Sequence, residues 1–233
     1  MLAQKLANSL PTIKPVTWTP LAESNLVGWW QFATGITDGG SPNYKVSQWN
    51  DQSTNANHFV QGTSGEQPTN GTGATYGVIV FDPSAKENLD TTAQISLDTD
   101  FTIGVALKLT SGGGVLLGDN TATGEFIKCF STSILRIKID NATAVDLSLD
   151  SGSFVGTGGY LVITRVSGLI TMNWNGVAQA DTETLTGSAD IDKLGVRKTN
   201  LNPYDGTIHE VMIFSKSNAT LTADVNARLS LFV

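Results

Sequence analysis

The stretch Phe101-Thr102-Ile103-Gly104-Val105-Ala106-Leu107-Lys108-Leu109-Thr110 decides the fold class. Large apolar residues occupy its odd positions, and small or polar residues occupy most of its even ones. Side chains of a β-strand point alternately to its two faces, so a period of two predicts a strand with one face in a core. The sequence therefore predicts a half-buried strand over 101–110, as part of a larger sheet.

The same alternation recurs along the chain between clusters of turn residues. It occupies 135–139, 145–149 and 170–174, and the last of these ends at the hairpin dipeptide Asn175-Gly176. A short continuous apolar run at 78–81 is typical of a strand that is covered on both faces. About a dozen such strands with short turns predict an all-β protein, built as an antiparallel sandwich or barrel.

Composition agrees with this fold class and excludes several functions. The 233 residues include 29 Thr, 24 Gly, 19 Ser and 16 Asn, while only 15% are charged. A net charge of −7 with scattered basic residues argues against a nucleic-acid partner, because no basic stripe is present to neutralise phosphates. No apolar run approaches the roughly 18 residues of a membrane span, so no membrane partner is expected. A single cysteine, Cys129, excludes an intrachain disulfide.

The N-terminal segment differs from the rest of the chain, and we expect residues 1–25 to form an arm. Leu2, Leu6 and Leu10 recur every four residues and would share one face of a short helix. Prolines at 11, 15 and 20 then favour an extended segment. The leucine stripe and Trp18 are candidate assembly contacts, either with the domain itself or with another subunit.

The C-terminal segment is the other place where a helix is expected. Leu221, Val225 and Leu229 would share its buried face, with Thr222 as its N-terminal cap and Asp224 in its first turn. A short helix that follows the last strand is expected to cover one end or edge of the sandwich. No linker is evident within 26–233, which predicts one domain preceded by the arm.

Two blocks of landmarks in a fixed order carry a family resemblance. The first block comprises Trp18-Thr19-Pro20, Leu26-Val27-Gly28-Trp29-Trp30, Trp49-Asn50-Asp51-Gln52-Ser53 and His58-Phe59-Val60-Gln61; the second comprises Tyr204-Asp205-Gly206-Thr207-Ile208-His209-Glu210-Val211-Met212-Ile213-Phe214 and Leu221-Thr222. This pattern resembles the concanavalin A-like, laminin G-like superfamily of lectins and glucanases. It looks most like the copies in bacteriophage virion proteins and in large bacterial surface proteins. The resemblance covers about 26–233 and implies a jelly-roll β-sandwich.

The resemblance also implies roles for single residues. It makes Trp49 a core residue and Glu210 a structural carboxylate that is bonded to neighbouring backbone. The chain departs from the family at 51–56, where an Asn-rich turn replaces the usual glycine turn. We expect asparagine there to adopt the left-handed backbone conformation. The adjacent Trp29 and Trp30 must point to opposite faces, so one enters the core and the other must be covered or exposed.

No catalytic site is expected. The superfamily's glucanases carry Glu-x-Asp-x-x-Glu or a close variant on one strand, and none of the six glutamates here fits that spacing. The nearest carboxylate patterns, Asp181-Thr182-Glu183 and Asp190-Ile191-Asp192, are interpreted as solvated positions. His58 and His209 are expected to have packing or hydrogen-bonding roles.

Two kinds of binding site stay open. Calcium could be held by Asp119 and Asn120 in a turn, although an Asp-Asn pair is also ordinary turn chemistry, so no metal or cofactor is assigned. A glycan could stack on an exposed Trp174 beside Asn173, with Tyr204 as a second platform, although the core interpretation is favoured because Ile170 and Met172 share the face of Trp174.

The sequence favours a non-enzymatic bacteriophage virion structural protein, namely a capsid decoration, baseplate or tail-appendage subunit. Its partners would be other virion subunits or further copies of itself, and its location would be the virion, assembled in the host cytoplasm. The alternative is a carbohydrate-binding, lectin-like module that attaches to cell-surface glycans.

Overall fold

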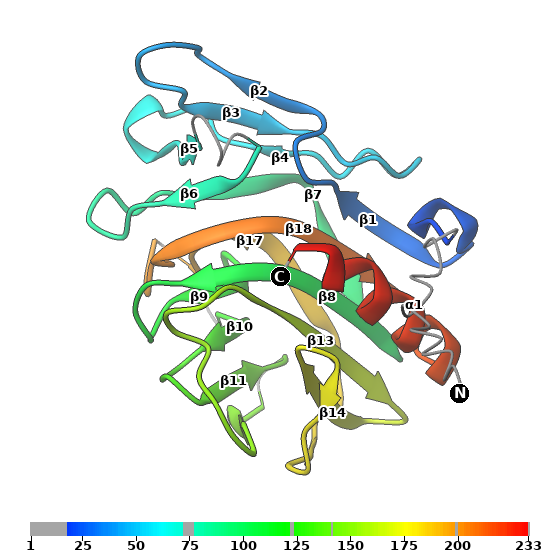
Figure 1. The fold of residues 1–233 in the computed structure, drawn as a ribbon. Helices are drawn as coiled ribbons and strands as arrows, with labels where there is room; N and C mark the ends of the chain where they lie inside the picture. Colours follow the sequence, from blue (N-terminus) through cyan, green and yellow to red (C-terminus); the bar gives the residue numbers. More distant parts are fainter. Residues whose placement is uncertain (1–17, 72–76, 122–123, 141, 199, 233) are drawn as a thin grey trace, which may run out of the picture.

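Two antiparallel nine-stranded sheets face each other in the computed structural model (Figure 1), which describes residues 18–71, 77–121, 124–140, 142–198 and 200–232. The first sheet follows the order β15 (Val177–Ala178), β14 (Leu169–Trp174), β13 (Gly159–Val166), β8 (Phe101–Leu109), β18 (Gly206–Phe214), β6 (Ile79–Phe81) and β5 (Thr69–Asn70), with β1 (Leu26–Trp30) beside β18 and β16 (Glu183–Thr184) beside β14. The second sheet follows the order β12 (Val145–Ser148), β11 (Ile134–Lys138), β10 (Phe126–Cys129), β9 (Val115–Gly118), β17 (Ala189–Leu194), β7 (Leu89–Leu97), β4 (Phe59–Val60), β3 (Val46–Trp49) and β2 (Ile36–Asp38). This arrangement confirms the predicted antiparallel β-sandwich.

The main core fills the space between the sheets. The inward residues of both layers meet there, and Trp30, Trp49 and Phe59 are completely buried among them. The burial of Trp49 confirms its expected core position. The hairpin predicted at Asn175-Gly176 joins β14 to β15, and both of its residues have positive φ, as the tight turn requires.

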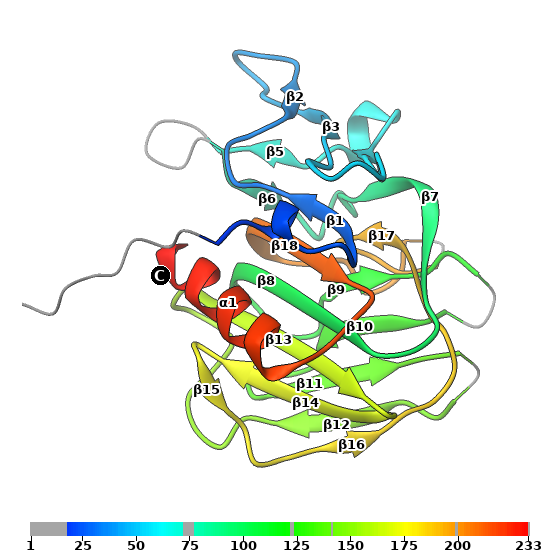
Figure 2. The same ribbon diagram turned by 90° about the vertical axis from the view of Figure 1, so that its right-hand side faces the viewer.

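Helix α1 (Ala219–Leu229) packs across the outer face of the first sheet, over β8 and β13 (Figure 2). Leu221, Val225 and Leu229 are its buried residues, as predicted, but the location differs from the expected end or edge. Gly104 permits this packing, because a Cβ there would lie 2.5 Å from Val225 Cγ1. As a result β8 is buried on both faces along most of its length rather than on one.

The start of α1 also differs from the prediction. Asn218 is the N-cap, and its side-chain Oδ1 accepts a hydrogen bond from the Leu221 N–H at 2.8 Å. Thr222 lies inside the helix, where its hydroxyl donates to the Asn218 carbonyl, and Asp224 lies beyond the first turn. Asn is among the most favoured N-cap residues, and Asn218 takes this position one turn before the expected Thr222. No helix in the described part of the chain is long and apolar enough to cross a membrane.

Glu210 ties α1 to the sheet through side chains rather than through backbone. Its completely buried carboxylate accepts hydrogen bonds from Trp29 Nε1 at 2.9 Å and from Arg228 Nε at 2.8 Å. The Arg228 guanidinium also lies 5.3 Å from the Trp29 ring. Trp29 is thus the ring that needs a cover, and α1 provides it. The expected backbone partners of Glu210 are corrected accordingly.

The described end of the arm packs on its own domain. The Trp18 ring lies 6.2 Å from that of Phe214, and Trp18 Nε1 donates to Glu23 Oε1 at 3.3 Å. Pro20–Ala22 forms a 3₁₀ turn, and further 3₁₀ turns occur at Ser64–Glu66 and Ser230–Phe232. Leu2, Leu6 and Leu10 lie outside the described residues, and the division into arm and domain stays a prediction.

The Asn-rich turn at 51–56 is built differently from the expectation. The residue with the left-handed backbone is Ala56, at φ 56°, rather than an asparagine. Asn55 instead donates from its side chain to the carbonyls of Leu26 and Val27. Asp51 accepts the Trp29 N–H at 2.8 Å, so this turn holds β1 in place.

Candidate functional site

A group of basic and aromatic side chains lies on the outer face of the second sheet. Along β10 the side chains of Ile127 and Cys129 enter the core, so those of Phe126 and Lys128 point outward. Phe130 follows directly and is 38% exposed, more than any other aromatic residue that the structure describes. Helix α1 packs on the other sheet, so this face is left open by it.

Close contacts between cations and rings join these residues into one surface. The Lys128 ammonium lies 5.7 Å from the Phe126 ring and 4.9 Å from the Phe130 ring. The Arg136 guanidinium is 3.5 Å from the Phe130 ring centre, and that of Arg197 is 4.7 Å from the Phe126 ring centre. Such contacts are favourable where water is partly excluded. We call Phe126, Lys128, Phe130, Arg136 and Arg197 the basic surface.

The basic surface places like charges side by side. Lys128 on β10 is the direct cross-strand partner of Arg136 on β11, and like charges in this position destabilise a sheet. Burial lowers the pKa of Lys128, and the neighbouring Arg197 and Arg136 lower it further, while Asp146 raises it by a smaller amount. The site therefore concentrates positive charge in a chain whose net charge is −7.

One carboxylate is hydrogen-bonded to the basic surface. Asp146 on β12 accepts two hydrogen bonds from Arg136, at 2.6 Å from Nε and 2.7 Å from Nη2. These hydrogen bonds lower the pKa of Asp146 and raise that of Arg136. No hydrogen bond or ion pair joins the Lys128 ammonium to another residue of the described chain. Arg136 is thus paired with a carboxylate by hydrogen bonds, whereas Asp146 acts on Lys128 only at longer range.

Acidic residues lie beside the basic surface, around the loop between β9 and β10. Asp119 accepts hydrogen bonds from the Thr121 N–H at 3.0 Å and from Gln94 Nε2 at 3.3 Å, while the Asn120 N–H donates to Asp192 at 2.9 Å. Burial and the neighbouring Asp119 raise the pKa of Asp192 to about 6. Within the described ranges no three acidic, His or Cys side chains are grouped as a metal site. Calcium at Asp119 and Asn120 stays a prediction.

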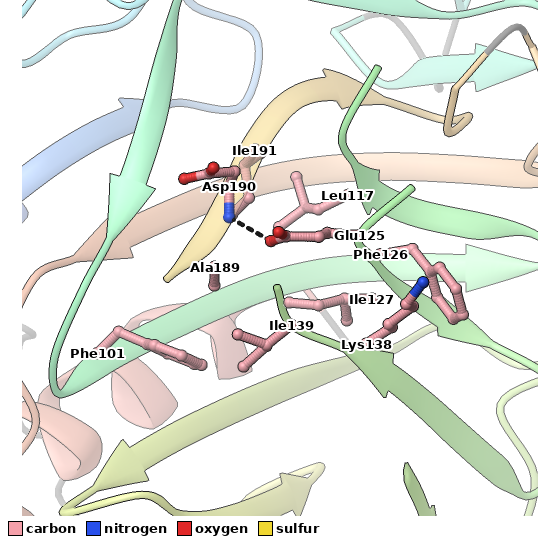
Figure 3. A pocket seen from close by; sticks show the side chains of 10 residues that line it. All are labelled: Phe101, Leu117, Glu125, Phe126, Ile127, Lys138, Ile139, Ala189, Asp190 and Ile191. Carbon is pink, nitrogen blue, oxygen red and sulfur yellow. Dashed lines mark hydrogen bonds between the residues drawn. The ribbon is translucent and has the colours of Figure 1, made fainter. Parts of the chain in front are cut away.

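A small enclosed pocket lies beneath this face, between the sheets (Figure 3). Its volume is about 10 Å³, room for roughly one water molecule. Glu125 accepts a hydrogen bond from the Asp190 N–H at 2.7 Å across the pocket, and burial raises the pKa of Glu125. Phe126 and Lys138 lie away from this hydrogen bond (Figure 3). The pocket is far too small for a sugar, so Glu125 has a structural role.

The expected aromatic platform is not exposed. Trp174 is 7% exposed and packs edge-on against Phe154, at 5.0 Å between ring centres. Tyr204 is completely buried, with its hydroxyl at 3.2 Å from the Lys108 carbonyl. Asn173, next to Trp174 on β14, is half-buried. Since the alternation of β14 directs Trp174 into the core, the glycan platform proposed at Trp174 and Tyr204 is corrected.

The two histidines serve packing and hydrogen bonding. His58 Nδ1 accepts the Asp51 N–H at 3.2 Å, which fastens the turn at 51–56. His209 stacks on Phe32 at 5.9 Å between ring centres, and burial lowers its pKa. Among the described residues the hydroxyl that contacts either ring is Thr207 Oγ1, at 3.5 Å from His209 Nε2, which is too long for the hydrogen bond of a catalytic pair.

The basic surface was not predicted from the sequence, although the sequence contains a signal for it. Phe126-x-Lys128-x-Phe130 places two rings and a cation at every second position, on the same side of one strand. Arg136 follows Lys128 by eight residues and lies in the next strand, β11. What the sequence lacks is the register that sets Lys128 opposite Arg136 and the long connection that brings Arg197 to Phe126.

No protein-family model and no curated protein matches the sequence. Solved structures do match. Domain 4 of the extracellular GH43 arabinanase AbnA from Geobacillus stearothermophilus, in complex with arabinotriose, is 15% identical with a TM-score of 0.61, over 88% of this chain and 98% of that one. A Trypanosoma rangeli sialidase mutant displaying trans-sialidase activity is 12% identical with a TM-score of 0.54, over 88% of this chain and 32% of that one.

These likenesses bear on the fold. This chain spans about a third of the length of the sialidase chain and nearly all of the arabinanase domain. At identities this low, shared architecture is what the matches establish. They confirm the concanavalin A-like β-sandwich that the resemblance implied.

Proposed function

We propose that this protein is a non-catalytic carbohydrate-binding module that holds its glycan on the basic surface of the second sheet. The observation that carries this proposal is the exposed Phe130 ring, flanked by cations on a sheet face that α1 leaves open. A ring offers the apolar face of a sugar a contact, while guanidinium and ammonium groups donate hydrogen bonds to its oxygens.

The fold comparison supports this class of function. The arabinanase domain that shares the architecture is in complex with arabinotriose, and its length corresponds to this chain almost throughout. The carboxylate at the basic surface, Asp146, is held by Arg136 in two hydrogen bonds. Most glycoside hydrolases use two carboxyl groups on either side of the scissile bond, about 5 to 9.5 Å apart. A binding role therefore fits this surface better than a hydrolytic one.

A glycan array with the full chain and two variants tests the proposal. Phe130→Ala removes the exposed ring, and we expect it to weaken the bound glycans about tenfold or more, the equivalent of 1.4 kcal/mol. Val177→Ala is the matched control, because Val177 is an exposed apolar residue on the first sheet. Absence of binding to any glycan, or equal binding by both variants, would contradict the proposal.

The virion role and virion location stay predictions from the sequence. The structural matches reported above include a bacterial enzyme domain and a trypanosome sialidase, neither of which bears on a role in a phage particle. In that prediction the leucine stripe at the N-terminus is a candidate contact with a homo-oligomeric or virion partner. Size determination of the full chain beside a variant lacking residues 1–17 tests that contact.

A further inference from the structure

We infer that the glycan bound at the basic surface is an acidic one, whose carboxylate or sulfate group is held by Lys128. This inference rests on the proposed function and narrows its ligand class. It depends on the charges of the surface, whereas the proposal of glycan binding depends on the exposed ring.

The first step is the unmatched charge of Lys128. The residue is 7% exposed, and its ammonium has aromatic rings as neighbours but no carboxylate hydrogen-bonded to it. Lys193, 6% exposed on β17 of the same sheet, shows the alternative, since its ammonium lies 2.5 Å from an oxygen of Asp90. Buried charges in proteins are ordinarily paired with an opposite charge, as Lys193 is with Asp90. Lys128 has no hydrogen-bonded carboxylate of this kind, and Asp146, the carboxylate that acts on it at longer range, is hydrogen-bonded to Arg136 instead.

The second step is the balance of charge over the whole surface. Lys128, Arg136 and Arg197 bring three positive charges, and Asp146 neutralises one of them through Arg136. Arg197 donates from Nε to the neutral amide oxygen of Asn202 at 3.1 Å. Two positive charges are therefore without a bonded carboxylate. A ligand with an acidic group would restore the balance.

The third step is access to the ammonium. The buried polar side-chain atoms without a partner in the described chain are Trp30 Nε1, Thr91 Oγ1 and Asn226 Oδ1. The Lys128 ammonium is not among them although it has no hydrogen bond, so its stem is buried while its tip meets solvent. A ligand atom can reach it beside the Phe130 ring. Hydrogen bonds between charged groups are about twice as strong as neutral ones, so an acidic group would be preferred over a hydroxyl.

An array of glycans in matched pairs tests this inference. Uronic and sialic acid glycans stand beside their methyl esters, and sulfated galactosides stand beside the unsulfated forms. We expect the full chain to bind the acidic member of a pair about tenfold more tightly, with a preference that weakens as salt is added. Comparison of the carboxylate pairs with the sulfate pairs shows which acidic group the site binds.

Three variants complete the experiment. Lys128→Met and Lys128→Gln remove the charge and should bind acidic and neutral members equally. Lys108→Met is the control, because Lys108 is exposed on β8 of the first sheet, and it should keep the preference. Equal binding of both members by the unmodified chain overturns the inference and leaves the proposed function standing. Absence of binding to every glycan overturns both.

Discussion

The outer faces of the two sheets handle buried charge in opposite ways. On the first sheet, α1 covers an apolar face, and the completely buried Glu210 has hydrogen bonds from both Trp29 and Arg228. On the second sheet, the stem of Lys128 is buried, its ammonium faces Arg136 across the strands, and no carboxylate of the described chain is hydrogen-bonded to it. The first arrangement stabilises the fold. The second arrangement destabilises the fold, and local destabilisation of this kind is typical of functional sites.

The largest expected effect is on the covered face. Arg228→Met leaves the Glu210 carboxylate buried without its guanidinium partner, which should lower the free energy of unfolding by about 3–5 kcal/mol. Urea unfolding followed by tryptophan fluorescence measures this. The double variant Glu210→Gln with Arg228→Met should regain part of the loss, because no charge is then left unpaired. A loss below about 1 kcal/mol for the single variant would contradict the assigned role of Glu210.

The same type of substitution on the open face should have the opposite sign. Lys128→Met removes a partly desolvated ammonium and its repulsion with Arg136 while keeping a long apolar side chain. We expect the free energy of unfolding to rise by about 1–2 kcal/mol. The same urea titration measures it, with Lys108→Met as the control that should change little. A loss of stability comparable to that of Arg228→Met would mean that Lys128 is structural.

The contrast between the faces also shows how far the sequence predicts this molecule. Alternation predicts the strands, since the two sheets need one apolar face each. The position of α1 is not predicted by the sequence, because Gly104 and Ala106 between the large residues of β8 have the pattern of a solvent-exposed face. They are small because Val225 and Leu229 pack on them. The sizes of the residues between the apolar positions thus carried the missing information.

The candidate site was harder to predict than the fold. Trp174 and Tyr204 were candidates because they are aromatic and near polar turns, yet exposure depends on which way a strand faces its partner layer. The basic surface depends on strand register, which sets Lys128 opposite Arg136. Arg197 joins them from a segment about seventy positions further along, and spacing in the sequence does not reveal that contact.

A smaller effect is expected among the acidic residues beside the basic surface. The pKa of Asp192 is raised to about 6, so between its ordinary 3.8 and 6 the folded state binds more protons than the unfolded state. Its charge therefore opposes folding above pH 6, and that penalty disappears as the pH falls below 4. Asp192→Asn keeps an acceptor for the Asn120 N–H and should raise the Tm at pH 7 by about 1–3 °C, since solvent screens the half-buried group.

Melting curves of both proteins from pH 4 to 7 check the sign. The difference in Tm should shrink as the pH falls from 6 towards 4, because the carboxyl of Asp192 is then protonated in the folded state and increasingly protonated in the unfolded state as well. A constant difference across this range would show that packing, rather than charge, distinguishes the two side chains.

The smallest expected effect on stability concerns the ion pair between Asp146 and Arg136 on the open face. Asp146 is 37% exposed at its side chain, so its ion pair with Arg136 should contribute less than about 1 kcal/mol, and less still at high salt. Arg136 holds the pKa of Asp146 below 3.8, so this contribution is present above pH 4 and is lost as the pH falls through the lowered pKa. Asp146→Asn should therefore lower the Tm slightly at pH 7.

The same change frees the Arg136 guanidinium for a ligand, so binding of acidic glycans should strengthen about two- to threefold. Calorimetric titration beside the melting curve distinguishes this outcome from a purely structural pair, whose loss would weaken binding and stability together.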